Sequence, residues 1–123
     1  MGHVTSIVVK GEKGEERLEN VPVDTGATYT FLEEKTLKKV GAVKLPTQVE
    51  VELGDGKKVL AGVYAIVIKF EDSEAPIIGA TFPGTKVVIG VEALESLGLR
   101  IDPTTNKLEQ VRPKGMAYFY FRK

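Results

Sequence analysis

The longest regular pattern in the sequence lies between Thr47 and Ile68 and is typical of a β-hairpin. Polar and apolar residues alternate over Thr47–Leu53 and alternate again over Lys57–Ile68. Between the two runs, Gly54-Asp55-Gly56 supplies the backbone freedom that a chain reversal needs. A long hairpin with a glycine-bounded tip is therefore predicted, and it favours a largely β fold.

Other short apolar segments are also separated by turn residues, as strands are. They predict a hairpin from Thr5–Val9 and Arg17–Val23 around a turn at residues 11–14, a strand at Ala75–Phe82, a buried strand at Val87–Gly90, and a hairpin within Leu99–Val111. The aromatic segment Met116–Phe121 is also strand-prone, and we expect it to pair within the monomer or with a partner chain rather than remain an open edge.

Two segments are predicted to be short helices. Glu33–Val40 begins with acidic residues, ends with basic ones and stops at Gly41, which suits the helix dipole and a left-handed C-terminal cap. Val91–Leu97 is followed in the same way by Gly98. The charges of the first helix are explained by a solvated face. The expected class is thus all-β with one or two short helices.

Composition limits the classes of function. The 123 residues suffice for one domain, spanning residues 1–123, with a core of its own. Seventeen basic and seventeen acidic residues cancel, so we expect neither a nucleic-acid nor a membrane partner. The chain has no cysteine, and its start lacks the pattern of a signal peptide. These features favour a soluble, cytoplasmic protein.

The stretch Val21–Leu32 is the candidate site, because an apolar run leads into a carboxylate, a hydroxyl and a glycine before another apolar run resumes. Asp24 follows a predicted strand, where an acid is ordinarily a turn residue. The tripeptide Asp24-Thr25-Gly26 alone is weak support for a site. A second element strengthens it: Val87-Val88-Ile89-Gly90 precedes the predicted helix at Val91–Leu97.

Together these two elements resemble the retropepsin-like aspartic proteases, over about Val4 to Leu108. The resemblance implies a closed, barrel-like acid protease fold and a homodimer in which each chain supplies one catalytic acid, Asp24. It implies that Thr25 and Gly26 support the acid pair and that Ala27 and Thr28 contact substrate. It also makes the long hairpin a flap over substrate, with Leu53, Gly54, Asp55 and Gly56 at its tip, and places Val88 in an apolar pocket. Without the resemblance, an ordinary surface hairpin would explain the first of these two features, and core packing would explain the second.

The chemistry agrees with this implication. Without cysteine or a serine and histidine pair, peptide hydrolysis must use carboxylates or a metal, and metal-ligand spacing is absent because His3 is the only histidine. We therefore expect no metal and no cofactor. Two carboxylates that share one proton divide the work of acid and base. Since the chain has no second Asp-Thr-Gly, a twofold homodimer is expected to bring Asp24 to Asp24 of its mate.

The sequence also departs from the family pattern. Viral members carry acids where this chain has Thr28 and Tyr29, and an arginine where it has Val91, so a cellular or prokaryotic branch is indicated. Ala27 cannot donate a hydrogen bond to the acid, which predicts a mildly acidic to near-neutral pH optimum. The expected activity is aspartic endopeptidase with polypeptide substrates.

Two alternatives stay open at this stage. One is a non-catalytic peptide-binding or dimerisation module that keeps the fold. The other, a glycosidase with paired carboxylates, would need a second well-placed acid from the same chain. Asp72, Asp102 and Glu92 lie in predicted turns or at a helix start.

Overall fold

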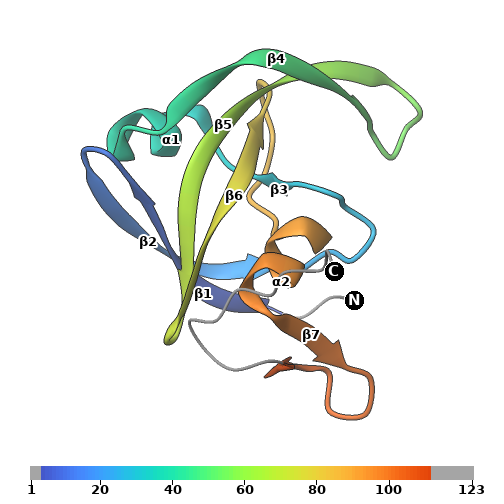
Figure 1. The fold of residues 1–123 in the computed structure, drawn as a ribbon. Helices are drawn as coiled ribbons and strands as arrows, with labels where there is room; N and C mark the ends of the chain where they lie inside the picture. Colours follow the sequence, from blue (N-terminus) through green and yellow to red (C-terminus); the bar gives the residue numbers. More distant parts are fainter. Residues whose placement is uncertain (1–3, 112–123) are drawn as a thin grey trace, which may run out of the picture.

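A computed structural model of the chain describes residues 4–111, which form mostly β-strands with two short helices (Figure 1). The strands are β1 (Val4–Gly11), β2 (Gly14–Pro22), β3 (Thr30–Phe31), β4 (Val43–Glu52), β5 (Lys58–Phe70), β6 (Ser73–Thr81), β7 (Leu99–Asp102) and β8 (Lys107–Gln110). The helices are α1 (Glu34–Val40) and α2 (Val91–Leu97). His3 and the predicted strand Met116–Phe121 lie outside the described residues.

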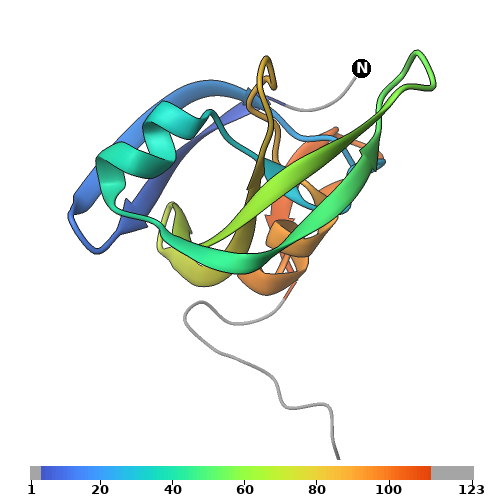
Figure 2. The ribbon, with the colours of Figure 1, turned by 90° about the horizontal axis from the view of Figure 1, so that it is seen from above.

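The main sheet has the strand order β2-β1-β5-β6-β3, and β4 also pairs with β5. β5 is long enough to pair with two strands along one edge. Its first part pairs with β4, and residues 67–69 pair with β1. β6 pairs along the other edge of β5, from Gly62 to Phe70. The sheet therefore forks at β5, and its strands curve around the core (Figure 2).

The expectation of a closed barrel is wrong for the described strands. β2 and β3 end the order of the sheet without pairing with each other, and β4 pairs only with β5. The physical reason is the fork, because β4 and β1 use different parts of the same edge of β5 and diverge from there. The all-β class with two short helices is confirmed at the coarser level.

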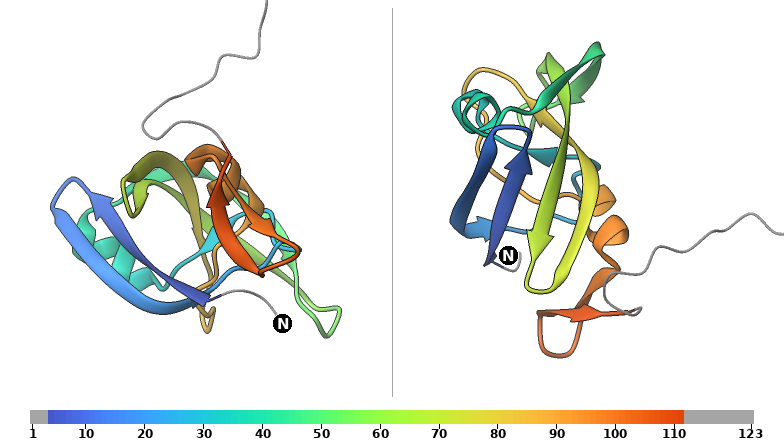
Figure 3. Two further views of the ribbon diagram at one scale, coloured as in Figure 1. Left: turned by 90° about the horizontal axis from the view of Figure 1, so that it is seen from below. Right: turned by 60° about the vertical axis from the view of Figure 1, so that its left-hand side comes forward.

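The predicted hairpins are confirmed. β1 and β2 pair antiparallel from Val4 and Pro22 to Gly11 and Gly14, with a register shift between Thr5 and Ile7. β4 and β5 pair from Val43 and Ala65 to Glu52 and Lys58, so the long hairpin begins earlier than the alternating pattern indicated. β7 and β8 form a separate two-stranded sheet next to α2 (Figure 3).

Both helices end as predicted. Gly41 and Gly98 follow α1 and α2 with φ of 75° in each case, a left-handed conformation that glycine adopts without a Cβ penalty. The Gly41 N–H donates to carbonyls of the last turn of α1, and the Gly98 N–H does the same for α2. The apolar side of each helix is buried, through Leu37 and Val40 in α1 and through Leu94 and Leu97 in α2.

The predicted strand Val87–Gly90 is reduced to two isolated pairings. Ile89 pairs with Val23 in parallel, and Val88 pairs with Phe31 antiparallel. The segment is too short for a regular ladder because it passes between the ends of β2 and β3. Ile89 is nevertheless buried, as the apolar run predicted, whereas Val88 is half-buried.

The core consists of two clusters of buried residues. The larger one joins β1, β5 and both helices, with Ile7, Leu37, Ile68 and Leu94 among its members. The smaller one lies under the β4–β5 hairpin. Its buried residues are Phe31, Ala61, Val63 and Ala80. Tyr29, Val51, Phe82 and Val88 pack against that cluster and are only partly buried, so the small cluster has an accessible side.

No helix within residues 4–111 is long and apolar enough to span a membrane.

Candidate active site

Asp24 lies two residues after the end of β2 at Pro22, on a backbone that is held from both sides. The Ile89 N–H donates to the Pro22 carbonyl at 2.9 Å, and the Asp24 N–H donates to the Ile89 carbonyl at 2.9 Å. Val23 between them is buried, with 2% of its surface exposed. The residue before the acid is thus anchored in the core, while the Asp24 side chain is exposed.

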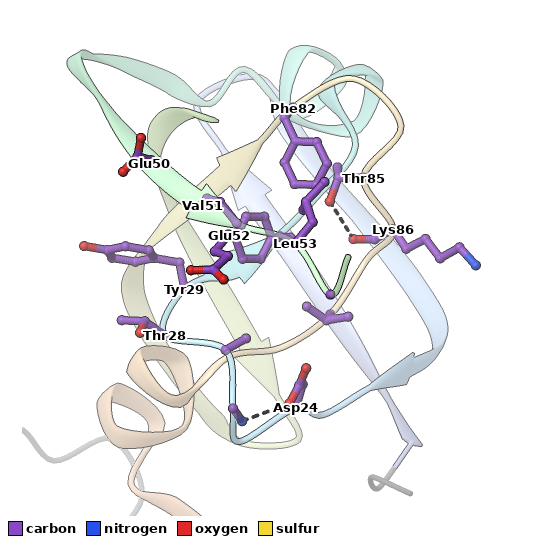
Figure 4. Close-up of a pocket in the computed structure, with 15 residues that line it drawn as sticks. Asp24, Thr28, Tyr29, Glu50, Val51, Glu52, Leu53, Phe82, Thr85 and Lys86 are labelled. Atoms are coloured by element: carbon purple, nitrogen blue, oxygen red, sulfur yellow. Dashed lines mark hydrogen bonds between the residues drawn. The ribbon is translucent and has the colours of Figure 1, made fainter. Parts of the chain in front are cut away.

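The acid also organises its own loop. The Gly26 N–H donates to Oδ1 of Asp24 at 2.9 Å, and the Ala27 N–H donates to the Asp24 carbonyl at 3.0 Å (Figure 4). A Cβ at position 26 would lie 3.2 Å from that Oδ1, which is tight. Glycine therefore lets the backbone approach the carboxylate closely, and the bond orients the acid.

The start of α2 is joined to the same loop. The Val91 N–H donates to the Ala27 carbonyl at 2.8 Å, and the Glu92 N–H donates to the Thr28 carbonyl at 2.9 Å. The Gly90 N–H donates to Oγ1 of the fully buried Thr30 at 3.1 Å. These bonds satisfy N–H groups that the first turn of a helix leaves without intrahelical partners.

Gly90 is required at this crossing because the two backbones nearly touch. A Cβ there would lie 2.2 Å from the Tyr29 carbonyl oxygen and 2.8 Å from that of Ala27. Beyond the crossing, Phe31 and Val88 exchange backbone hydrogen bonds of 2.9 and 3.1 Å. Residues 22–31 and 88–92 therefore form one interlocked unit, which we call the floor.

A cavity of about 460 Å³ lies between the floor and the end of the β4–β5 hairpin (Figure 4). We call residues 50–58 of that hairpin the tip. The lining combines carboxylates, small residues and apolar side chains. It consists of Asp24, Gly26, Ala27, Thr28, Tyr29, Phe31, Glu50, Val51, Glu52, Leu53, Gly54, Phe82, Thr85, Lys86 and Val88. Its size is in the range of small-molecule and peptide side-chain sites.

Most of the residues that the sequence singled out meet at this pocket. Residues from the Asp24 motif line it together with Leu53, Gly54 and Val88, although they come from three separate parts of the chain. Thr25, Asp55 and Gly56 are exposed and lie outside the lining. Asp55 instead closes the turn of the tip, because its Oδ1 accepts the Lys57 N–H at 3.0 Å.

Sequence reasoning missed about half of the lining. Glu50, Val51 and Glu52 end β4 immediately before Leu53 and were within reach of the alternating pattern. Phe82, Thr85 and Lys86 flank a turn and carry no local signal. Phe82 is brought to the pocket by an edge-on contact with Phe31, with ring centroids 5.8 Å apart. Only the three-dimensional arrangement identifies these residues.

Three acids among the described residues have a perturbed pKa, and all lie outside the pocket; one is Glu19 in β2, whose pKa is lowered by a hydrogen bond from Ser6. Burial raises the pKa of Glu92 at the start of α2, although the carboxylate also accepts the Ile78 N–H at 3.3 Å. A hydrogen bond from the Thr104 N–H lowers the pKa of Asp102 in the β7–β8 turn. Neither group lines the pocket. Within residues 4–111, no three His, Asp or Glu side chains are grouped so that they could hold a metal ion.

The molecule is thus a mostly β domain with one exposed, backbone-oriented carboxylate at the floor of a pocket. No model of a known protein family matches the chain. A search of curated proteins also finds no match.

Proposed function

We propose that this protein is an aspartic endopeptidase of the retropepsin kind that acts as a twofold homodimer. The observation that carries the proposal is the position of Asp24. Its carboxylate is exposed on an interlocked floor, is oriented by the Gly26 N–H and opens into a pocket that a long hairpin covers. A carboxylate held in this way reaches substrate without needing to rearrange.

The proposed chemistry needs two such carboxylates. Like charges a few ångströms apart resist ionising together, so the pair holds one proton in common. The ionised member takes a proton from a water molecule, whose oxygen attacks the peptide carbonyl carbon. The protonated member polarises the carbonyl oxygen and then gives its proton to the leaving nitrogen as the C–N bond breaks. Each protomer contributes one Asp24.

The single chain has features suited to such a pairing. Asp24, Thr25 and Gly26 are consecutive and exposed. Within the described part of the chain, the Thr25 hydroxyl has no hydrogen bond, so it is available to a second copy. A twofold axis near this loop would place identical residues opposite each other, as a self-complementary interface requires.

An extended peptide fits the space between the floor and the tip. β4 pairs only with β5 among the described strands, so its other edge has backbone groups available for strand addition. Apolar side chains of the peptide would contact Phe31, Val51 and Val88, while the scissile bond lies over Asp24. The substrate class we propose is therefore unfolded or extended polypeptide.

The test is hydrolysis of a denatured protein by the wild type and by Asp24→Asn. We expect the substitution to lower the rate by about a hundredfold or more. Because Asp24 is exposed, the substitution should change the free energy of unfolding of the protein by about 0.5 kcal/mol or less. Asp55→Asn is the matched control for the rival acid. A statine-type transition-state mimic should inhibit, and the rate should peak at mildly acidic to near-neutral pH.

Undiminished cleavage by Asp24→Asn would overturn the proposal. If the wild type binds extended peptides without cutting them, the protein is a binding module instead. The dimer is tested separately, by measuring the specific activity against protein concentration together with the mass in solution. A dimeric site loses specific activity on dilution as it dissociates, whereas activity that is independent of concentration in a monomer would contradict the shared site.

A further inference from the structure

The pocket carries an unbalanced set of charges. Three acidic residues, Asp24, Glu50 and Glu52, line it together with one basic residue, Lys86. Within residues 4–111, the side chains of Glu50, Glu52 and Lys86 form no ion pair, although six other pairs are present. The pocket is therefore more negative than the neutral chain as a whole, and its acids are available to a ligand.

The directions of these side chains distinguish their roles. In Figure 4 the Glu52 carboxylate is directed toward the side of the pocket where Tyr29 and Thr28 lie. The Lys86 ammonium group extends away from the pocket, and Glu50 lies further along β4 from the tip. Glu52 is thus the carboxylate of the tip that faces the space between the hairpin and the floor.

Other parts of the pocket wall are apolar or aromatic. Tyr29, Phe31 and Val51 are partly or fully buried around the small core cluster, and all three line the pocket. A Lys or Arg side chain matches this combination, because its aliphatic stem packs against apolar surface while its charged end reaches a carboxylate. The face of an aromatic ring such as Tyr29 also attracts a cation.

We propose that Glu52 makes the pocket select a basic side chain, Lys or Arg, of the bound peptide; this inference rests on the proposed function. A bound peptide displaces water from the pocket. A neutral side chain would then leave the Glu52 carboxylate with less hydration and no partner, which is unfavourable. An acidic side chain would be repelled, whereas a basic one compensates the charge.

The experiment compares the cut sites that wild type, Glu52→Gln and Glu52→Lys produce in one digest of denatured protein, mapped by mass spectrometry. We expect Lys and Arg to be enriched about threefold at one position near the cut by the wild type. The enrichment should fall to about one in Glu52→Gln and turn toward Asp and Glu in Glu52→Lys. Loss of folding cannot produce a reversed preference.

Glu15→Gln is the matched control, because it removes an exposed carboxylate of β2 that does not line the pocket. It should keep the wild-type preference. Cleavage with no basic enrichment at any position would overturn the inference and leave the proposed function intact. A preference for basic residues that Glu52→Lys leaves unchanged would also overturn the inference.

If neither the wild type nor any variant cuts a substrate, the proposed function fails. The selectivity of the pocket is then tested by measuring peptide binding. The probe is then a labelled apolar peptide with one central arginine, compared by fluorescence anisotropy with the same peptide carrying neutral citrulline. We expect the wild type to bind the arginine peptide about threefold more tightly and Glu52→Gln to bind both alike. Equal binding of the two peptides by the wild type would overturn the inference.

Discussion

The floor and the tip face each other across one pocket but are built in opposite ways. Residues 22–31 and 88–92 of the floor bond across to each other, and Val23, Thr30 and Ile89 are almost fully buried. The tip bonds mainly to itself, through the Leu53 N–H to the Lys57 carbonyl and the Gly56 N–H to the Leu53 carbonyl. Most of its residues are exposed.

The difference separates two requirements of the proposed site. An acid that must meet its counterpart needs a backbone that resists displacement, and the interlocked floor provides one. A cover that admits a peptide needs a low cost of local opening, which a segment with few buried contacts provides. Substitutions of the buried floor residues, such as Thr30 and Gly90, should therefore damage stability and activity together, and substitutions in the tip should affect stability much less.

Two glycine substitutions give the sharpest contrast. Gly90→Ala places a methyl group against the Tyr29 and Ala27 carbonyls, and we expect it to cost about 3 kcal/mol of unfolding free energy or more. Gly54→Ala meets nothing within 4 Å and should cost about 0.5 kcal/mol or less. Chemical denaturation measures both. Equal costs would contradict the distinction between floor and tip.

Thr30 tests the hydrogen bond at the crossing. Thr30→Val keeps the shape but removes the oxygen that accepts the buried Gly90 N–H, so about 1–3 kcal/mol should be lost. Thr30→Ser keeps the oxygen and loses only a methyl group, which makes it the matched control. Chemical denaturation midpoints of the two variants measure the contribution of this hydrogen bond. A Thr30→Val protein that is more stable than Thr30→Ser would contradict it.

Gly56 is the one place where the tip should be sensitive. Its φ of 88° is a left-handed conformation that disfavours a side chain, so Gly56→Ala should cost about 1 kcal/mol. Because no atom lies within 4 Å of its added Cβ, the cost comes from the backbone alone. Gly56→Asn should recover part of it, since asparagine tolerates this region better. Thermal unfolding of the two variants provides the measurement.

The smallest expected effect concerns Glu92, the last residue of the floor, which lies in the first turn of α2. Burial raises the pKa of this carboxyl, so its protonated form is favoured in the folded state. Its contribution to stability is present below the ordinary pKa of 4.5 and is lost as pH rises through the raised value. Glu92→Gln should therefore raise the Tm by about 1–3 °C at neutral pH.

That gain should vanish below pH 4.5, where the native carboxyl is also neutral. Unfolding curves of wild type and variant across pH test the sign. A Glu92→Gln protein that is less stable than wild type at neutral pH would show that the bond to the Ile78 N–H outweighs the cost of burial.

Local patterns were enough to predict most of the elements. Alternation identified the β4–β5 hairpin, and the glycines at 41 and 98 marked the ends of both helices. The pattern failed at Val87–Gly90, where an apolar run indicated a strand but the chain makes only isolated pairings. An apolar run indicates burial, and burial alone does not specify which backbone groups pair.

The candidate site, like the fold, was predicted in part from the sequence. The sequence by itself was enough to single out the short strings Asp24-Thr25-Gly26 and Val88-Ile89-Gly90 as the candidate site. It also determined the hairpin, through a two-residue period that any strand imposes.

Only the tertiary structure decided that the sheet formed by residues 4–111 is not closed, that Gly90 must be glycine because another backbone passes against it, and that Glu52 lines the same pocket as Asp24. These properties depend on contacts between segments far apart in the chain. Such contacts arise from the packing of whole elements, and no local pattern encodes them.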